Sequence, residues 1–315
     1  MRVSAVVPAY NEEKNIRRLL SSLLAQKMSG GQLTELVVVA SGCTDTTHAQ
    51  VEAVARADAR VRMIVQDARM GKTAALNAYT RERDPRADVI VMSSADLLVQ
   101  PGCLQVFLDA FANHPRVGMV GARPVPTNPR GTLMGDVVHF LWALHHEIAL
   151  EAPKLGEIVA VRGHLLVPLP QESPVDEASL EAHVVAQGYA LRYLPDALVV
   201  NRGPDNIREF IDQRRRIAAG HFWLRDSTGY AVSTLDARRI VKHALQHLTL
   251  SDPKTDASYL AAAALEALAR GLGWLDFRRH HSHAVWKVAP STRQVVRIPA
   301  EAVPTPLRSR KAGYG

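Results

Sequence analysis

Polar and glycine-bearing loops follow four predicted strands in the first third of the chain. The strands are predicted over residues 3–7, 36–39, 61–65 and 89–92, each from a short apolar run. The loops after them are Pro8-Ala9-Tyr10-Asn11-Glu12, residues 40–45, residues 69–72 and Ser94-Ala95-Asp96. Because the carboxyl ends of parallel strands meet at one edge of a sheet, these loops should lie together. Their residue types favour a small ligand that carries phosphate.

Two further groups of polar side chains come later. Asp176 and Glu177 stand at the start of a predicted helix, after a proline-bounded loop. Such carboxylates can take a proton from an attacking hydroxyl, although acids at a helix start also stabilise the helix dipole. Gln213 and Arg216 are three residues apart in a long predicted helix, so they share a face. For the intervening Arg214 and Arg215, a solvated or lipid-facing helix edge is the simpler interpretation.

The elements that must position these residues alternate between apolar strands and amphipathic helices, which predicts an α/β fold with a mostly parallel sheet. Asn11 is the predicted cap of the first helix. The other helices are predicted over 46–57, from 71, from 101, and over 134–150, 177–188, 206–225, 235–249 and 258–276. Further extended segments are predicted over 117–121, 158–161 and 189–201.

Length and composition restrict the class of protein. The chain has 315 residues, of which 47% are hydrophobic and 22% charged, so a globular protein with a sizeable core is expected. Two cysteines cannot form a disulfide framework, which favours a reducing compartment. Neither a signal peptide nor an apolar run of membrane-spanning length is evident. We expect a cytoplasmic protein, or one that touches the inner face of a membrane peripherally.

The positive charge is concentrated at one end. The net charge is +7, and residues 278–315 contain eight Lys or Arg against one acid, so the first 277 residues balance at zero. This basic end is interpreted either as a solvated extension or as a contact for anionic lipid, with nucleic acid the less favoured partner.

The loops are also similar to the motifs of a known family. Val6-Val7-Pro8-Ala9-Tyr10-Asn11-Glu12-Glu13 resembles the opening of family 2 glycosyltransferases, which have the GT-A fold and act by inversion. The resemblance continues in order through the segments Ser41-Gly42-Cys43-Thr44-Asp45, Arg69 to Asn77, Ser94-Ala95-Asp96, Asp176-Glu177, Tyr193 to Ala197 and Gln213 to Arg216. Together these segments cover about residues 3–225.

The resemblance implies a site for a nucleoside diphosphate sugar. The residues it assigns to the donor are Pro8, Tyr10, Glu12, Ser41, Arg69, Lys72, Ser94, Ala95 and Asp96. Asp96 is the implied ligand of Mg²⁺ or Mn²⁺, because hard cations prefer carboxylate oxygens. Ser94 replaces the first acid of the family's Asp-x-Asp motif, so a weaker metal site, or one that needs no metal, is the alternative. Ala40 and Ser41 stand where two acids are usual, which leaves the nucleobase open.

The resemblance also implies the acceptor side of the site. Glu177 is the implied catalytic base, with Asp176 as its competitor because the two acid types are swapped here. Arg162 and Gln213 with Arg216 are assigned to the diphosphate or the acceptor. Ile217 stands where processive members have a tryptophan, which argues against a chain-extruding synthase.

The sequence therefore predicts an inverting, non-processive transfer of a sugar, most simply from a UDP sugar, to a hydroxyl acceptor. A sugar-nucleotide-binding protein without catalysis is the alternative, and a nucleotidyltransferase is disfavoured because no glycine-rich loop follows the first strand. We expect a catalytic domain over 1–230 and a helical extension with a basic tail over 231–315. The extension's helices are expected to pack on the domain, with a homodimer contact or a membrane contact as alternatives.

Overall fold

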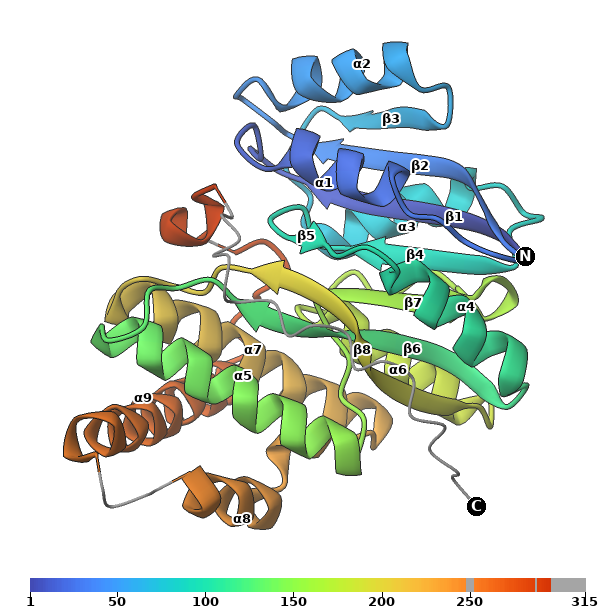
Figure 1. Cartoon of the computed structure of the whole chain (residues 1–315). Coiled ribbons are helices and arrows are strands. Elements are labelled where there is room, and N and C mark those ends of the chain that lie inside the picture. The colour runs from blue at the N-terminus through green and yellow to red at the C-terminus, as the bar shows by residue number, and fades with distance from the viewer. Residues whose placement is uncertain (248–251, 287, 296–315) are drawn as a thin grey trace.

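The computed structural model describes residues 1–247, 252–286 and 288–295, and its centre is an eight-stranded sheet (Figure 1). The strand order is β3-β2-β1-β4-β7-β6-β8-β5. The strands are β1 (Arg2–Ala9), β2 (Gln32–Ser41), β3 (Val61–Gln66), β4 (Val89–Ser93), β5 (Leu98–Val99), β6 (Val117–Pro126), β7 (Ile158–Arg162) and β8 (Ala190–Asn201). The short β5, which pairs with β8, is absent from the sequence-based prediction.

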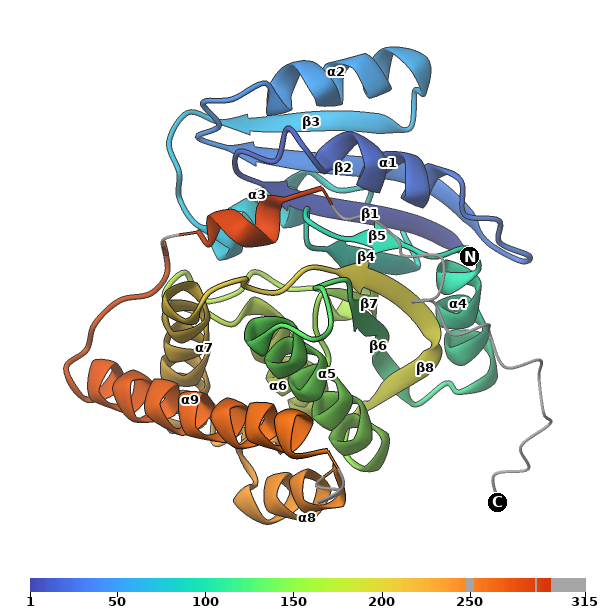
Figure 2. The same cartoon turned by 60° about the vertical axis from the view of Figure 1, so that its left-hand side comes forward.

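Helices cover both faces of this sheet and then form a separate layer (Figures 1 and 2). They are α1 (Ile16–Leu24), α2 (Thr47–Ala57), α3 (Lys72–Glu82), α4 (Cys103–Asn113), α5 (Leu133–Glu151), α6 (Asp176–Ala186), α7 (Ile207–Thr228), α8 (Ala237–His247) and α9 (Pro253–Arg278). Successive side chains of a strand point to opposite faces, so Val7 packs with the core that contains Leu19 and Phe107, whereas Val6 packs with Leu76 and Tyr79. Burial on both faces explains the continuous apolar runs.

The first helix begins later than the sequence predicts. It starts at Ile16, and Asn11 does not cap it. Asn11 instead adopts a left-handed conformation (φ 54°), which asparagine tolerates better than most residues. Its amide oxygen accepts a hydrogen bond from the backbone N–H of Thr44 at 2.8 Å, and its amide nitrogen donates to the Thr44 hydroxyl at 3.0 Å. Asn11 therefore joins the loops after β1 and β2.

β7 runs antiparallel to its neighbour β4, and this reversal decides which residues reach the site. Ile158 at the start of β7 pairs with Ser93 at the end of β4, whereas Arg162 pairs with Val89 at the other end. The amino-terminal end of β7 therefore meets the carboxyl ends of β1, β2 and β4. The residue before β7 is Glu157, whose carbonyl accepts a hydrogen bond from the Ser94 N–H at 2.8 Å.

The last long helix, α9, packs on α7 and α5 (Figure 2). The contact with α7 is made by charged pairs: Arg214 is bidentate on Glu266 with both distances 2.7 Å, and Arg215 is bidentate on Asp276 with both distances 2.5 Å. Arg214 and Arg215 are thus ion-paired between helices, and their interpretation as a solvated edge is wrong. The described helices include none that is long and apolar enough to cross a bilayer.

Beyond α9 the chain turns back toward the sheet as a strap, defined here as the described residues of 279–295 (Figure 2). A single turn over Pro290–Arg293 ends next to the loop after β1. Ser291 fastens this turn to the start of α7, because its hydroxyl donates to Glu209 and accepts from the backbone N–H of Asp205. The strap has no counterpart among the predicted elements.

Candidate active site

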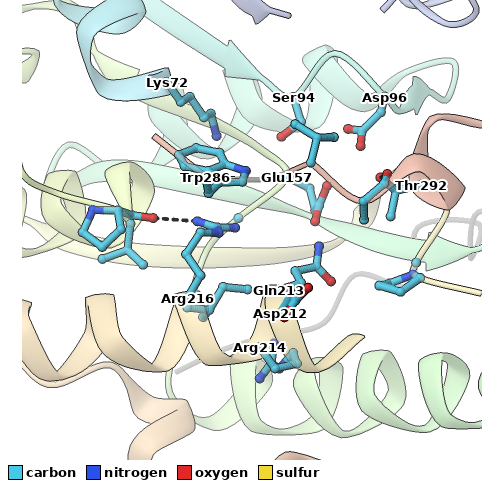
Figure 3. Close-up of a pocket in the computed structure, with 18 of the residues that line it drawn as sticks. Lys72, Ser94, Asp96, Glu157, Asp212, Gln213, Arg214, Arg216, Trp286 and Thr292 are labelled. Carbon is cyan, nitrogen blue, oxygen red and sulfur yellow. Dashed lines mark hydrogen bonds between the residues drawn. The ribbon is translucent and has the colours of Figure 1, made fainter. Parts of the chain in front are cut away.

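One cavity of about 1000 Å³ lies where the strand ends, α5, α6, α7 and the strap converge. Every predicted site residue except Arg162 lines it: Pro8, Tyr10, Glu12, Ser41, Arg69, Lys72, Ser94, Ala95, Asp96, Asp176, Glu177, Gln213 and Arg216. Figure 3 shows how Lys72, Ser94, Asp96 and Arg216 face this space. Residues up to 208 positions apart in the sequence thus share one cavity.

Arg162 is the exception, and its assignment to the diphosphate or acceptor is wrong. Its Nε donates to the Val117 carbonyl at 2.7 Å, and its Nη2 donates to the carbonyls of Phe111 and His114 at 2.9 and 3.2 Å. Because β7 is antiparallel, Arg162 lies at the opposite edge of the sheet, where it holds the end of α4.

The corner after β1 has the features of a nucleoside pocket. Burial, together with the charge of Asp96, raises the pKa of Glu12 to about 8. Its Oε1 lies 3.1 Å from Nε of Arg293, but its buried Oε2 has no hydrogen-bond partner among the described residues. The ring of Tyr10 lies beneath the guanidinium of Arg69, 4.1 Å from the ring centroid. The guanidinium of Arg293 also lies over this ring, 5.2 Å from the centroid, so the group left for a ligand at this corner is the unpaired Oε2, which can bind a hydroxyl.

Two carboxylates face the centre of the cavity from β4 and β7 (Figure 3). Burial raises the pKa of Asp96, and burial together with the charge of Asp96 raises the pKa of Glu157 to about 7. No ion pair joins either carboxylate to a Lys or Arg of the described residues. Mg²⁺ in sites of this type is held by one or two carboxylates, water and substrate phosphates, so Asp96 and Glu157 fit a divalent cation. Within the described chain, no cluster of three or more His, Cys, Asp or Glu suits a metal.

Lys72, at the start of α3, bridges the two acids at the start of α6. Its Nζ lies 3.0 Å from Oδ2 of Asp176 and 2.5 Å from Oε1 of Glu177. Burial alone would lower the pKa of Lys72, but the two carboxylates raise it. Burial and the charge of Glu177 raise the pKa of Asp176 to about 6. Burial opposes ionisation of Glu177 too, yet Lys72 and Lys154 lower its pKa to about 2.

Arg216 is a buried cation without a carboxylate partner at ion-pair distance in the described chain. Its Nη1 donates to the Pro174 carbonyl at 2.7 Å, and its guanidinium stacks on the Trp286 ring 4.2 Å from the centroid (Figure 3). Burial lowers its pKa to about 10, so Arg216 stays charged at neutral pH. It is therefore available to an anionic group in the cavity.

Three residues of the site escape the sequence-based prediction. Glu157 is one, and its positive φ of 63° at the start of a short strand is not visible in the sequence. The other two come from the strap. Trp286 accepts a hydrogen bond on its carbonyl from Arg69, and Arg293 donates to the Tyr10 carbonyl. The ring of Trp286 lies against the guanidinium of Arg216.

Comparisons with known proteins agree with this geometry. Residues 4–150 match the model of the family described as "Glycosyl transferase family 2". Similar chains include the probable glycosyltransferase YdaM of Bacillus subtilis (strain 168), 24% identical over 237 residues, which are 70% of this chain and 55% of that one. Another is the undecaprenyl-phosphate 4-deoxy-4-formamido-L-arabinose transferase of Shewanella sediminis (strain HAW-EB3), 36% identical over 100 residues, 31% of this chain and 30% of that one. This chain thus spans about half of the first relative and less of the second.

A solved structure extends the similarity over most of the chain. A mannosyltransferase from Pyrobaculum calidifontis, in complex with GDP-Man and Mn²⁺, superposes with a TM-score of 0.59 at 24% identity. The similarity covers 90% of this chain and 83% of that one. The predicted α/β GT-A fold, followed by C-terminal helices, is confirmed. Residues 4–150 thus match the glycosyl transferase family 2 model, which agrees with the resemblance that the motifs indicate, and the shared fold extends over most of the chain.

Proposed function

We propose that the protein is an inverting, non-processive glycosyltransferase that moves one sugar from a nucleoside diphosphate sugar to a hydroxyl acceptor. The observation that carries this proposal is the single cavity in which the Asp176–Glu177 pair faces the donor loops. A donor and an acceptor that share one enclosed space can react directly, which an inverting transfer requires.

The proposed step is a single displacement. A carboxylate of the Asp176–Glu177 pair takes the proton of the acceptor hydroxyl, and the oxygen attacks the anomeric carbon from the face opposite the diphosphate. The new C–O bond forms as the bond to the diphosphate oxygen breaks, and the diphosphate leaves with the electron pair. Arg216 and Lys72 supply positive charge where this negative charge develops.

Between the two acids, we assign proton acceptance to Glu177. Its side chain is 17% exposed to the cavity against 5% for Asp176, so it is the more accessible of the two. Lys72 must then move from Glu177 for the base to work, because a carboxylate with a pKa of about 2 accepts a proton poorly. The diphosphate of the donor is the anion that would draw Lys72 away.

We propose Asp96 and Glu157 as the protein ligands of Mg²⁺ or Mn²⁺. When bound, such a cation neutralises the diphosphate and stabilises its departure. The mannosyltransferase neighbour was solved with Mn²⁺, and no Lys or Arg among the described residues forms an ion pair with either carboxylate here. The serine at position 94 makes this site poorer in charge than an Asp-x-Asp site, so we expect weak metal affinity.

The alternative is a sugar-nucleotide-binding protein without catalysis, which the neutral residues Ala40, Ser41 and Ser94 favour. Purified protein should be incubated with UDP-glucose, GDP-mannose and other nucleoside diphosphate sugars, with Mn²⁺ or with EDTA, and release of the nucleoside diphosphate followed over time. Release that Glu177→Gln abolishes supports the transferase, and the donor used names the nucleobase, which we predict to be uracil. If wild type and Glu177→Gln both bind the donor tightly and neither releases the nucleoside diphosphate, the alternative is supported.

A further inference from the structure

The outward face of α9 has the polarity of a buried surface. Its exposed residues between 257 and 275 are all apolar: Ala257, Leu260, Ala263, Ala264, Ala267, Leu268, Gly271, Trp274 and Leu275. Leu260 is 61% exposed, Leu268 55% and Trp274 48%. This set is called the outer face of α9 below. Scattered exposed leucines are ordinary, but a continuous apolar face marks an interaction surface.

The polar residues of the same helix point the other way, toward α7. Glu266 and Asp276 pair with arginines of α7, and Arg270 donates to the Thr234 carbonyl at 3.0 Å. At about 100° per residue, the outer face occupies an arc of about 140°, and the charged pairs lie opposite it. The inner side is apolar as well, since Ala262 and Ala269 are buried and Leu265 packs with the cluster that contains Phe140. The helix therefore differs from an ordinary surface helix, whose outward side is polar. Exposed apolar side chains do not stabilise the folded chain itself. We therefore attribute the outer face of α9 to contact with a partner.

The outer face is long and lies at one end of the molecule. From Ala257 to Leu275 the helix axis extends about 27 Å, at about 1.5 Å per residue. Helix α8, which exposes Val241 and Leu245 at 56% and 62%, lies at the same end, remote from β3 in both Figures 1 and 2. The donor loops after β1 and β2 are part of the opposite half of the sheet.

The net charge near the face is positive at its carboxyl-terminal end, whereas at the other end the exposed N-cap Asp252 offsets Lys254. Lys254 is exposed near the start of α9, and Arg278 and Arg279 are exposed at its end. The guanidinium of Arg278 lies over the Trp274 ring, 5.7 Å from the centroid, which combines an aromatic ring and a cation. The acids of α9 itself, Asp256, Glu266 and Asp276, are not exposed. The sequence from 278 onward continues this excess, with eight basic residues against one acid.

We propose that the outer face of α9 docks on the surface of an anionic membrane. Its leucines and Trp274 would enter the headgroup region, while Lys254, Arg278 and Arg279 would contact acidic headgroups. Tryptophan is enriched at this depth because its ring is amphipathic. A second copy of the chain suits the face less well, because the face itself carries no exposed acid to meet Arg278 and Arg279, and the exposed Asp252 near its other end is offset by Lys254.

The test is sedimentation of the full-length protein with vesicles of phosphatidylcholine alone or with about 30% phosphatidylglycerol. Wild type should bind the anionic vesicles at least tenfold more tightly than the neutral ones, and high salt should weaken that binding. Leu268→Glu places a carboxylate on the outer face and should reduce binding about tenfold or more. Val185→Glu is the matched control, because Val185 is an exposed apolar residue (42%) on α6, and it should bind as wild type.

Further outcomes distinguish this proposal from its rivals. Brominated lipids should quench tryptophan fluorescence in wild type, and Trp274→Phe should lose most of that quenching. Equal binding by Leu268→Glu and wild type would overturn the proposal, because the basic end of the chain would then bind alone. A stable dimer by light scattering that Leu268→Glu dissociates would also overturn it. Neither result depends on donor turnover, so the proposed activity can fail while this inference stands.

Discussion

Replacing Lys72 with methionine removes the one cation that lies within ion-pair distance of Asp176 and Glu177 in the described chain. Methionine keeps the length and apolar stem of the side chain, so packing should change little. The two carboxylates are then left in a poorly solvated cavity beside each other. We expect the folded protein to lose stability at neutral and alkaline pH, and to regain it as acid protonates the pair.

The magnitude follows from the pKa values of the pair in wild type. Lowering the pKa of Glu177 from 4.5 to about 2 contributes about 3 kcal/mol to stability above pH 4.5, and this is lost as the pH falls through 2. Raising the pKa of Asp176 from 3.8 to about 6 costs about 3 kcal/mol above pH 6, and this cost disappears as the pH falls toward 4. With Lys72 present, the two terms nearly cancel at pH 8.

Without Lys72 the favourable contribution of Glu177 disappears and burial raises both pKa values. Removing one partner of a buried ion pair typically costs about 3–5 kcal/mol, which we expect for Lys72→Met at pH 8. At pH 5 both carboxyls would be largely protonated in the folded state, so the deficit should shrink to about 1–2 kcal/mol.

Urea denaturation at pH 5 and pH 8 measures both quantities. Lys27→Met, a change at an exposed lysine, is the matched control and should unfold as wild type at both values. Adding Glu177→Gln to Lys72→Met should recover part of the lost stability at pH 8, because one buried charge is gone. A Lys72→Met protein that unfolds within 1 kcal/mol of wild type at pH 8 would refute the reasoning.

Of three further predictions, two concern residues of the cavity and one concerns Arg162 at the opposite edge of the sheet. Glu157→Gln and Asp96→Asn should each weaken Mn²⁺ binding at least tenfold by calorimetry with a nucleoside diphosphate present, and equal affinity in Glu157→Gln would exclude it as a ligand. Arg162→Leu should lower the free energy of unfolding by about 1–3 kcal/mol, because it leaves carbonyls of α4 unpaired, with nucleotide affinity unchanged. Arg293→Ala removes the ion pair to Glu12 and should change nucleotide affinity by calorimetry, whereas an unchanged affinity would place the nucleoside away from this corner.

The order of strands and helices follows closely from apolar periodicity, because a doubly covered sheet leaves strong patterns. Apolar periodicity does not predict, however, at which end of the strands a given residue lies. Glu157 precedes β7 and Arg162 ends it, and the family resemblance led to the assignment of the arginine. β7 is antiparallel, so the amino-terminal flank reaches the cavity. The four-residue apolar run of β7, Ile158 to Val161, contains no information about the direction of the strand in the sheet.

The strap is a second part of the site that the sequence does not predict. Trp286 and Arg293 belong to a segment with little regular structure, so no periodicity marks them. Their partners Arg69, Arg216 and Tyr10 lie between 70 and 283 residues away in the sequence. Single-sequence reasoning identifies what such residues could do, but the partner is fixed only by tertiary packing.

For the three consecutive arginines of α7, helical spacing predicts the direction of each side chain but not its partner. Since a helix turns about 100° per residue, Arg214, Arg215 and Arg216 must point in three directions, and the i, i+3 spacing correctly groups Arg216 with Gln213 at the cavity. The ion-pair partners of Arg214 and Arg215 lie on α9, a helix that begins nearly 40 residues later. This helix places Glu266 and Asp276 inward and three of its leucines, Leu260, Leu268 and Leu275, outward. The sequence of α9 alone does not indicate this orientation, because the arginines that pair with its acids lie on α7. The charged pairs of α7 and the exposed apolar residues of α9 are therefore connected, because Glu266 and Asp276 occupy inner positions of α9 that apolar residues would otherwise hold.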